Sequence, residues 1–217
     1  MWDKVNFLCE VGTEEIPAGY IPAAIEHVKK KFSDAFAAHR IPCDGVTVYA
    51  TPRRIIVCGE SLAAAQKEEM LEFKGPSADR AYDADGKPSK ALTGFMQGNG
   101  LAEKDLEKRD TPKGAYIYGM RKAESKATSE ILPSIVSETI LSVPFPKTMR
   151  WNTKTVAFPR PVRYLCVMFN DKVVPVEIDG IKSGNLTRGH YVRSREMLTV
   201  GSISSYPKLL TDNNVCF

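Results

Sequence analysis

VRYLCVMF, residues 162–169, is the most apolar run of the 217-residue chain. Its length and its content of aliphatic and aromatic residues are typical of a buried strand. Asn170-Asp171 follows as a two-residue turn, and the next apolar stretch, Val173–Ile178, predicts a returning strand. The sequence therefore predicts a central β-hairpin.

The N-terminal part predicts a strand, a helix and a strand pair. Residues 6–11 (NFLCEV) form a short apolar run, and Ile41-Pro42 ends the helix that follows it. Residues 46–49 and 55–58 predict two strands joined at Thr51-Pro52-Arg53-Arg54. The apolar side of the helix repeats at helical spacing: Ile21, Ile25, Val28, Phe32 and Phe36.

The middle of the chain predicts further short elements. Residues 89–98 and 101–106 suit two short helices, and residues 115–122 alternate as a strand does. Residues 129–141 carry the pattern of an amphipathic helix.

These elements predict an α+β fold with mixed β-sheets, packed helices and two subdomains. We expect an N-terminal strand–helix–strand unit in residues 1–74 and an insert-like helix–hairpin–helix unit in 75–146. The third expected unit is a basic β-hairpin region in residues 147–217, which we expect to be truncated at the C-terminus.

Composition excludes several classes of protein. Hydrophobic residues make up 43% and charged residues 26%, the balance of a soluble globular protein. No apolar run suits a membrane span or a signal peptide. The five cysteines are odd in number and form no C-x-x-C, so we expect reduced thiols without metal in a cytoplasmic protein.

Positive charge is concentrated late in the chain. Residues 147–195 contain 10 Lys and Arg against 3 Asp and Glu, a net charge of +7, although the whole chain carries only +4. Aromatic residues lie between these cations, which suits phosphates and unpaired bases. The alternative is a solvated face with its own cation–π pairs. The nucleic-acid candidates are Lys147, Arg150, Trp151, Arg160, Arg163 and Arg188.

Arg53 and Arg54 are adjacent at a bend fixed by Pro52. Neighbouring residues of an extended chain point to opposite sides, so we do not expect both to serve one ligand. One of them is a candidate for a phosphate or for an interface, and the other for an ion pair with Glu10, Glu14 or Glu15.

Two further features have a functional and a structural interpretation. Glu10, Glu14 and Glu15 lie within six residues and could act as acid–base or metal groups, or could cap the following helix. His190 could be catalytic or a structural hydrogen-bonding group. We favour the structural interpretation for both.

Five ordered blocks carry a resemblance to a known family. They are residues 10–18 (EVGTEEIPA), 49–54 (YATPRR), 73–76 (FKGP), 145–151 (FPKTMRW) and 180–190 (GIKSGNLTRGH). Together they resemble the N-terminal part of the β subunit of the bacterial heteromeric glycyl-tRNA synthetase. The block at 158–163 (FPRPVR) also fits, although Pro159 departs from the family's pattern.

The resemblance implies ATP-dependent glycylation of tRNA(Gly) by a hetero-oligomer. In that family the catalytic core belongs to the α subunit, so ATP and Mg are expected there and no cofactor or catalytic residue in this chain. The implied partners are the α subunit and tRNA(Gly), with no membrane.

Two other functions stay open from the residues alone. One is a self-standing hydrolase that uses Glu14, Glu15 and His190. The other is a protein-interaction scaffold whose basic stretch docks an acidic partner.

Overall fold

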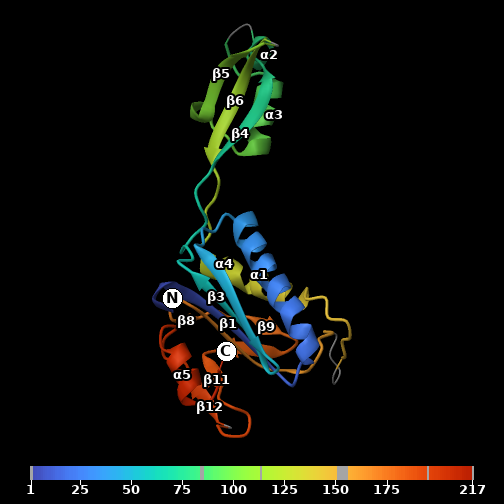
Figure 1. Cartoon of the computed structure of the whole chain (residues 1–217). Coiled ribbons are helices and arrows are strands. Elements are labelled where there is room, and N and C mark those ends of the chain that lie inside the picture. The colour runs from blue at the N-terminus through green and yellow to red at the C-terminus, as the bar shows by residue number, and fades with distance from the viewer. Residues whose placement is uncertain (1, 84–85, 113, 151–155, 195, 217) are drawn as a thin grey trace. The chain divides into compact units, whose positions relative to one another are not determined.

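A computed structural model of the chain describes residues 2–83, 86–112, 114–150, 156–194 and 196–216. The chain forms two compact units (Figure 1). Unit 1 comprises residues 1–67 and 126–217, and unit 2 comprises residues 68–125. Trp151, one of the nucleic-acid candidates, lies outside the described residues.

Unit 1 is built on one mixed sheet. Its strand order is β2-β3-β1-β7-β10-β9, with β8 also paired to β7. The central strands are antiparallel, and β10 runs parallel to β7. The strand bounds are β1 Val5–Thr13, β2 Gly45–Thr51, β3 Arg54–Glu60, β7 Val162–Phe169, β8 Lys172–Val173, β9 Glu177–Ile178 and β10 Ile181–Gly184.

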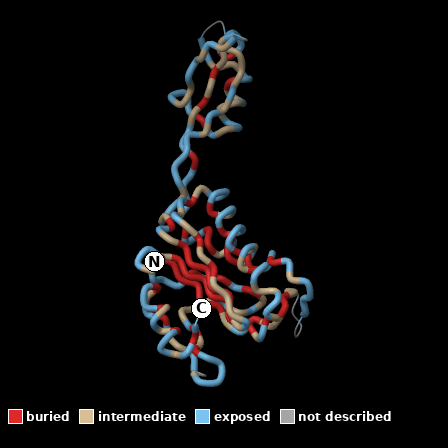
Figure 2. Tube along the Cα trace, in the orientation of Figure 1, coloured by how far each residue is buried: buried red, intermediate tan, exposed pale blue. Residues whose placement is uncertain are grey.

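Strand β1 is covered on both faces, which explains why its sequence is a continuous apolar run and does not alternate. Phe7, Cys9 and Val11 face one hydrophobic core, and Leu8 faces a second core. Figure 2 shows the central strands as a buried band. Glu10 points to the second face and is the one buried acidic side chain among the described residues.

Helices cover the two faces of this sheet. Helix α1 (Ile21–Ala38) and helix α4 (Thr128–Leu141) pack on the first face through apolar side chains such as Phe32 and Leu132. The second face is covered by the C-terminal segment, which contains helix α5 (Tyr206–Asp212). A small pair of strands, β11 (Leu186–Arg188) and β12 (Met197–Thr199), precedes it. A 3-10 turn, η1 (Trp2–Lys4), and another, η2 (Ala18–Tyr20), lead into β1 and α1.

The predicted central hairpin is only partly correct. Asn170 and Asp171 do form a two-residue turn, with φ of 47° and 61°, as a type I′ turn requires. The prediction of a full returning strand is wrong, because β8 contributes only two residue pairs to β7. The long partner of β7 is β1, and β10 lies on the other side of β7, so β1 and β7 form the centre of the sheet.

Unit 2 is a three-stranded antiparallel sheet in the order β4-β6-β5, with helices on one face. Its elements are β4 Met70–Ser77, α2 Ala78–Ala81, α3 Lys90–Asn99, η3 Glu103–Asp105, β5 Leu106–Thr111 and β6 Gly114–Lys122. Leu92 and Ile117 are the larger buried side chains of its small core. The sequence predicted α3 and β6 but not β4 or β5.

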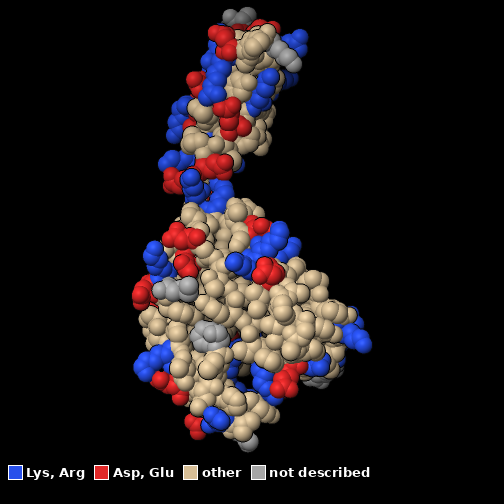
Figure 3. All heavy atoms as spheres, in the orientation of Figure 1, with Lys and Arg blue, Asp and Glu red and all other residues tan. Residues whose placement is uncertain are grey.

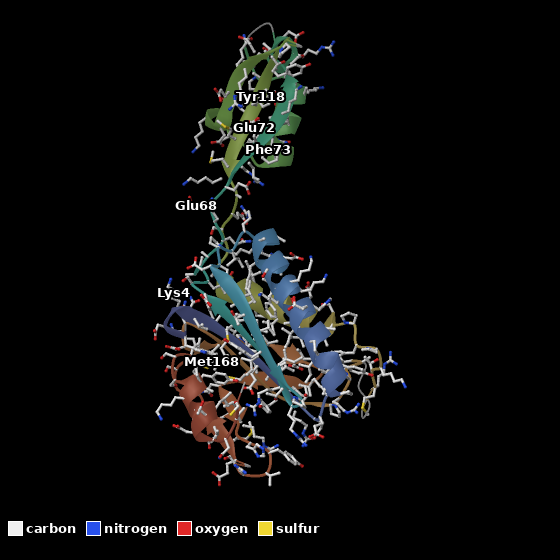
Figure 4. All side chains as sticks on the ribbon, viewed as in Figure 1. Lys4, Glu68, Glu72, Phe73, Tyr118 and Met168 are labelled. Carbon is white, nitrogen blue, oxygen red and sulfur yellow. The ribbon has the colours of Figure 1, made fainter. Side chains whose placement is uncertain are left out.

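The other face of the unit 2 sheet is polar. Arg109 pairs with Glu72 at 2.7 Å, and the Lys74 ammonium lies 3.9 Å from the ring centroid of Tyr116. Figure 4 shows Tyr118 on β6 beside Glu72 on β4. On the face of unit 2 seen in Figure 3, positive and negative side chains are interspersed, which is typical of a solvated sheet face.

The structural units differ from the ranges 1–74, 75–146 and 147–217. Unit 2 begins before Gly75-Pro76, because the chain leaves unit 1 after Lys67. Helix α4 lies in unit 1, because its apolar side packs into the core formed with α1 and the large sheet. The fold class is α+β, as predicted. Among the described residues, no helix is both long and apolar enough to cross a membrane.

Candidate functional site

Unit 1 contains a cleft of about 450 Å³ at one end of its sheet. The end of β1 and the residues after it supply residues 13–15 to its lining, and the β2–β3 turn with its flanking strand ends supplies residues 51–54. The start of β7 adds residues 163 and 164, and the remaining lining comes from residues 188–192 and 214–216. Segments far apart in the sequence thus meet at one place.

Backbone hydrogen bonds hold the walls of this cleft together. The amide of Thr13 donates to the carbonyl of Arg53 at 2.8 Å, and the amide of Ile16 donates to the carbonyl of Pro52 at 2.7 Å. The amide of Glu14 donates to the carbonyl of Pro161 at 3.0 Å. The segment after β1 is therefore fixed between the β2–β3 turn and the start of β7.

A buried ion pair lies at the base of the cleft. The Arg54 guanidinium donates to Glu10 Oε1 at 2.9 Å, and the two side chains are 6% and 0% exposed. The Tyr164 hydroxyl donates to the same Oε1 at 2.8 Å, and the Thr187 hydroxyl donates to Oε2 at 2.6 Å. Because a buried charge is costly unless it is paired and hydrogen-bonded, these donors explain why Glu10 is tolerated inside the sheet.

Arg54 also connects the sheet to the strand β11. Its Nη2 donates to the carbonyl of Arg188 at 2.8 Å and to the carbonyl of Gly189 at 3.3 Å. Burial alone would lower the pKa of Arg54, but the Glu10 carboxylate together with Tyr164 and Tyr206 outweighs burial, and the pKa rises. Burial and the same carboxylate raise the pKa of the Tyr164 hydroxyl, which stays protonated and able to donate.

Gly12 leaves the space that the Tyr164 ring occupies. Gly12 and Tyr164 are register partners on β1 and β7, and a Cβ on Gly12 would lie 2.1 Å from Cε1 of the ring. Only glycine leaves this space for the ring that reaches Glu10. The glycine within the EVGTEE block is therefore part of the same network.

Arg53 forms one wall of the cleft. Its Nη1 lies 3.3 Å from Glu14 Oε2, and its Nη2 lies 3.4 Å from Glu15 Oε1. Its guanidinium carbon lies 3.7 Å from the ring centroid of Tyr191, which is 48% exposed. The two arginines thus point to different places, as predicted, and both contact carboxylates of the Glu10–Glu15 cluster.

Two further predicted cations, Arg163 and Arg188, line the same cleft. Arg163 is 59% exposed, and its Nε lies 3.4 Å from Glu14 Oε1. Glu14 therefore bridges Arg53 and Arg163. The structure brings together Arg53, Arg54, Arg163 and Arg188 of the eight residues that the sequence singled out.

The other candidates lie outside the lining of this cleft. Lys147 and Arg150 are exposed on the segment before β7. Arg160 is half-buried, and its guanidinium donates to the carbonyl of Pro159 at 2.7 Å. Phe158 anchors this segment, because its ring packs edge-on against Phe145 at 5.1 Å.

The acidic cluster does not cap a helix. The first turn of α1 contains no acidic residue, and Glu14 and Glu15 pair with arginines. His190 acts as a structural acceptor, because its Nδ1 accepts the backbone N–H groups of Val192 at 3.2 Å and Arg193 at 3.3 Å.

Three of the five thiols lie inside the sheet. Cys9, Cys58 and Cys166 are buried on the central strands, and Cys43 is half-buried. Burial, together with the neighbouring Glu10 charge, raises the pKa of Cys9 to about 12. A buried protonated thiol behaves as a small apolar side chain.

The sequence did not identify Tyr191 or Thr187 as parts of the site. Tyr191 follows the GNLTRGH block directly, and its proximity to Arg53 comes from a contact between residues 138 positions apart. The spacing of residues within a helix or strand cannot predict a contact over such a distance in the sequence. Glu10 drew attention as one of three carboxylates within six residues, and a charged residue within an apolar strand, as in FLCEV, is the signal that could have shown its burial.

Comparisons with known proteins agree with the blocks on which the site is built. The family model described as glycyl-tRNA synthetase beta subunit matches residues 7–217. The chain is 38% identical over 212 residues to the glycine–tRNA ligase beta subunit of Clostridioides difficile, covering 98% of this chain and 31% of that protein. It is 36% identical over 203 residues to that of Syntrophotalea carbinolica, covering 94% of this chain and 30% of that protein.

The chain spans about 30% of the length of these curated relatives. The matched range contains the Glu10–Arg54 pair and every residue that lines the cleft. The chain belongs to the family of glycyl-tRNA synthetase beta subunits.

Proposed function

We propose that this chain, as the N-terminal part of a glycyl-tRNA synthetase β subunit, supports the binding of tRNA(Gly) and the assembly with the catalytic α subunit. The family match over residues 7–217 is the observation that carries this proposal. ATP-dependent glycylation would then take place on the α subunit, with ATP and Mg bound there. Such an enzyme acts in the cytoplasm, where tRNA is charged.

The charge distribution of unit 1 supports a role in RNA binding. Three predicted arginines, Arg53, Arg163 and Arg188, come from separate segments and line one cleft. Lys147 and Arg150 add exposed cations on the segment that leads into β7. Phosphate contacts by such residues supply most of the affinity of proteins for nucleic acids.

The contacts of the acidic residues speak against the hydrolase alternative. A general base needs a carboxylate within reach of a substrate proton. Glu14 lies within 3.4 Å of both Arg53 and Arg163 and is engaged in two ion pairs. His190 Nδ1 accepts two backbone N–H groups. We therefore favour binding over catalysis for this chain.

The salt dependence of tRNA binding tests the proposal. Each phosphate contact adds about 0.7–0.9 to the slope of log affinity against log salt. The assembled enzyme should bind tRNA(Gly) with a steep slope. The triple variant Lys147→Glu/Arg150→Glu/Arg188→Glu should weaken binding and flatten that slope.

Three outcomes separate the alternatives. Unchanged tRNA affinity and slope in the triple variant would refute the RNA-binding role of these residues. A lost association with the α subunit together with an intact slope would make this basic stretch an interface with that subunit. Glycine-dependent ATP–pyrophosphate exchange by the chain alone would contradict the assignment of catalysis to the α subunit.

A further inference from the structure

We infer that the cleft of unit 1 binds one unpaired nucleotide of an RNA strand. The inference rests on the proposed function, because it names the part of the RNA that this site would take. It also predicts a different contact from the exposed cations Lys147 and Arg150, which lie outside the cleft lining.

A planar platform suited to a nucleobase forms one wall of the cleft. The Arg53 guanidinium stacks on the Tyr191 ring at 3.7 Å. Glu14 and Glu15 hold the guanidinium from its edge, at 3.3 Å and 3.4 Å. Unpaired bases stack on aromatic rings and on arginine planes, and this arrangement provides both.

Arg163 is positioned to contact the phosphate. Its side chain is 59% exposed, and its ion pair with Glu14 is long, at 3.4 Å between Nε and Oε1. Glu14 has a second arginine partner in Arg53. A phosphate oxygen can therefore become the partner of Arg163 while the Glu14 carboxylate keeps its other ion pair.

Size and charge both fit a single nucleotide. The volume of about 450 Å³ lies within the range of roughly 300–1,000 Å³ that holds small ligands, and an RNA duplex is far larger. Four arginines line the cleft, and the carboxylates are Glu14 and Glu15 in the lining and Glu10 beneath it. The excess of one positive charge matches one phosphodiester.

The buried network keeps this cleft in shape without a ligand. Arg54 fixes the backbone at Arg188 and Gly189, and Glu10 fixes Arg54 and Tyr164. A site held in place before binding loses less conformational entropy when the ligand enters. An acidic peptide would also pair with the arginines, but its carboxylate side chains would not stack on the plane of Arg53 and Tyr191.

Fluorescence anisotropy of the full chain with a labelled, unstructured uridine-only RNA strand tests this inference. Tyr191→Ala should lower affinity about 5- to 30-fold without changing the salt slope, because it removes stacking. Arg163→Ala should lower affinity and reduce the slope by about 0.7, the value of one phosphate on a single strand. Lys172→Ala, on β8 next to the far end of β7 and outside the cleft lining, is the matched control and should change affinity less than twofold.

Competitors identify the ligand class. Unlabelled single strand should displace the probe, its duplex with a complementary strand should do so poorly, and free uridine monophosphate should do so weakly at high concentration. Equal displacement by polyglutamate, with an unchanged affinity in Tyr191→Ala, would overturn the inference in favour of an acidic protein partner. Absence of single-strand binding at low salt would also overturn it.

The assembled enzyme separates this inference from the proposed function. If tRNA(Gly) still binds with a steep salt slope while Tyr191→Ala and Arg163→Ala leave affinity within twofold, the nucleotide site is refuted and the tRNA-binding role stands. If the wild-type enzyme does not bind tRNA(Gly), the proposed function itself is refuted.

Discussion

Replacing Arg54 by leucine should destabilise unit 1 by about 3–5 kcal/mol, the cost of leaving a buried charge without its partner. Glu10 is fully buried and would keep the hydroxyl donors of Tyr164 and Thr187, at 2.8 Å and 2.6 Å, but no longer a cationic partner. Two carbonyl groups, of Arg188 and Gly189, would also lose their donor. Each of these lost hydrogen bonds is worth about 1 kcal/mol, so the two carbonyls account for about 2 kcal/mol of the loss.

The same structure predicts that the effect of Glu10→Gln on the free energy of unfolding has opposite signs in the wild-type chain and in the Arg54→Leu variant. In the wild-type chain this change leaves Arg54 uncompensated and should destabilise by roughly 2–4 kcal/mol. In the Arg54→Leu background it removes the uncompensated carboxylate and should restore about 1–3 kcal/mol. A sign reversal of this kind arises only when the two charges are directly coupled.

Urea unfolding followed by tryptophan fluorescence measures both effects. The Trp2 ring lies 5.8 Å from that of Tyr206 and 6.3 Å from that of Tyr49, so it reports on the face of the sheet that Arg54 supports. The chain contains two tryptophans, and replacing Trp151 by phenylalanine leaves Trp2 as the single probe. An equal effect of Glu10→Gln in both backgrounds, or a loss below about 1 kcal/mol for Arg54→Leu, would refute the reasoning.

Three further changes test separate parts of the same region. Gly12→Ala should cost about 1–3 kcal/mol in urea unfolding, because its Cβ would overlap the Tyr164 ring, whereas Gly19→Ala, with open space around it, should be nearly neutral. Thr13→Val should leave stability unchanged or raise it by up to about 1 kcal/mol, because the buried Thr13 hydroxyl has no hydrogen-bond partner among the described residues; a clear loss in the urea midpoint would contradict this. The pKa of Cys9 is raised from 9.0 to about 12, so its stabilising effect is complete below pH 9 and is lost as pH rises towards 12. The free energy of unfolding in urea, measured between pH 8 and 11, should fall less steeply in Cys9→Val, by up to about 1.4 kcal/mol per pH unit, and identical slopes would exclude this thiol as a cause.

Much of the sheet could be predicted from the sequence, because its strands are short apolar runs bounded by turn residues. Strands β1 and β7 and helix α1 lie where the pattern predicted them. The partners of β7 could not be predicted, because β10 joins it through long-range parallel pairing that depends on tertiary packing. Strands β4 and β5 were not predicted, because their exposed faces carry many charges, which weakens the apolar alternation.

The candidate site was predictable in part. The adjacent arginines and the basic stretch pointed to Arg53, Arg54, Arg163 and Arg188, which meet at the cleft. Local spacing could not show that Arg54 is buried on Glu10 while Arg53 faces the cleft. That difference follows from the register of β3 against β1, where Gly12 lies opposite Arg54. The stacking of Tyr191 depends on the path of the loop after β11, which has no repeating pattern.

The connections between the two units suggest how the chain could have gained residues 68–125. Ala65 and Ala127 form a β-bridge, and the amide of Gln66 donates to the carbonyl of Lys126 at 3.1 Å. The residues before and after the inserted segment are therefore already neighbours, held by unit 1 itself. A gene segment that encodes residues 68–125 could be added or lost in evolution as a cassette, since a short turn between Lys67 and Lys126 would close the remaining chain.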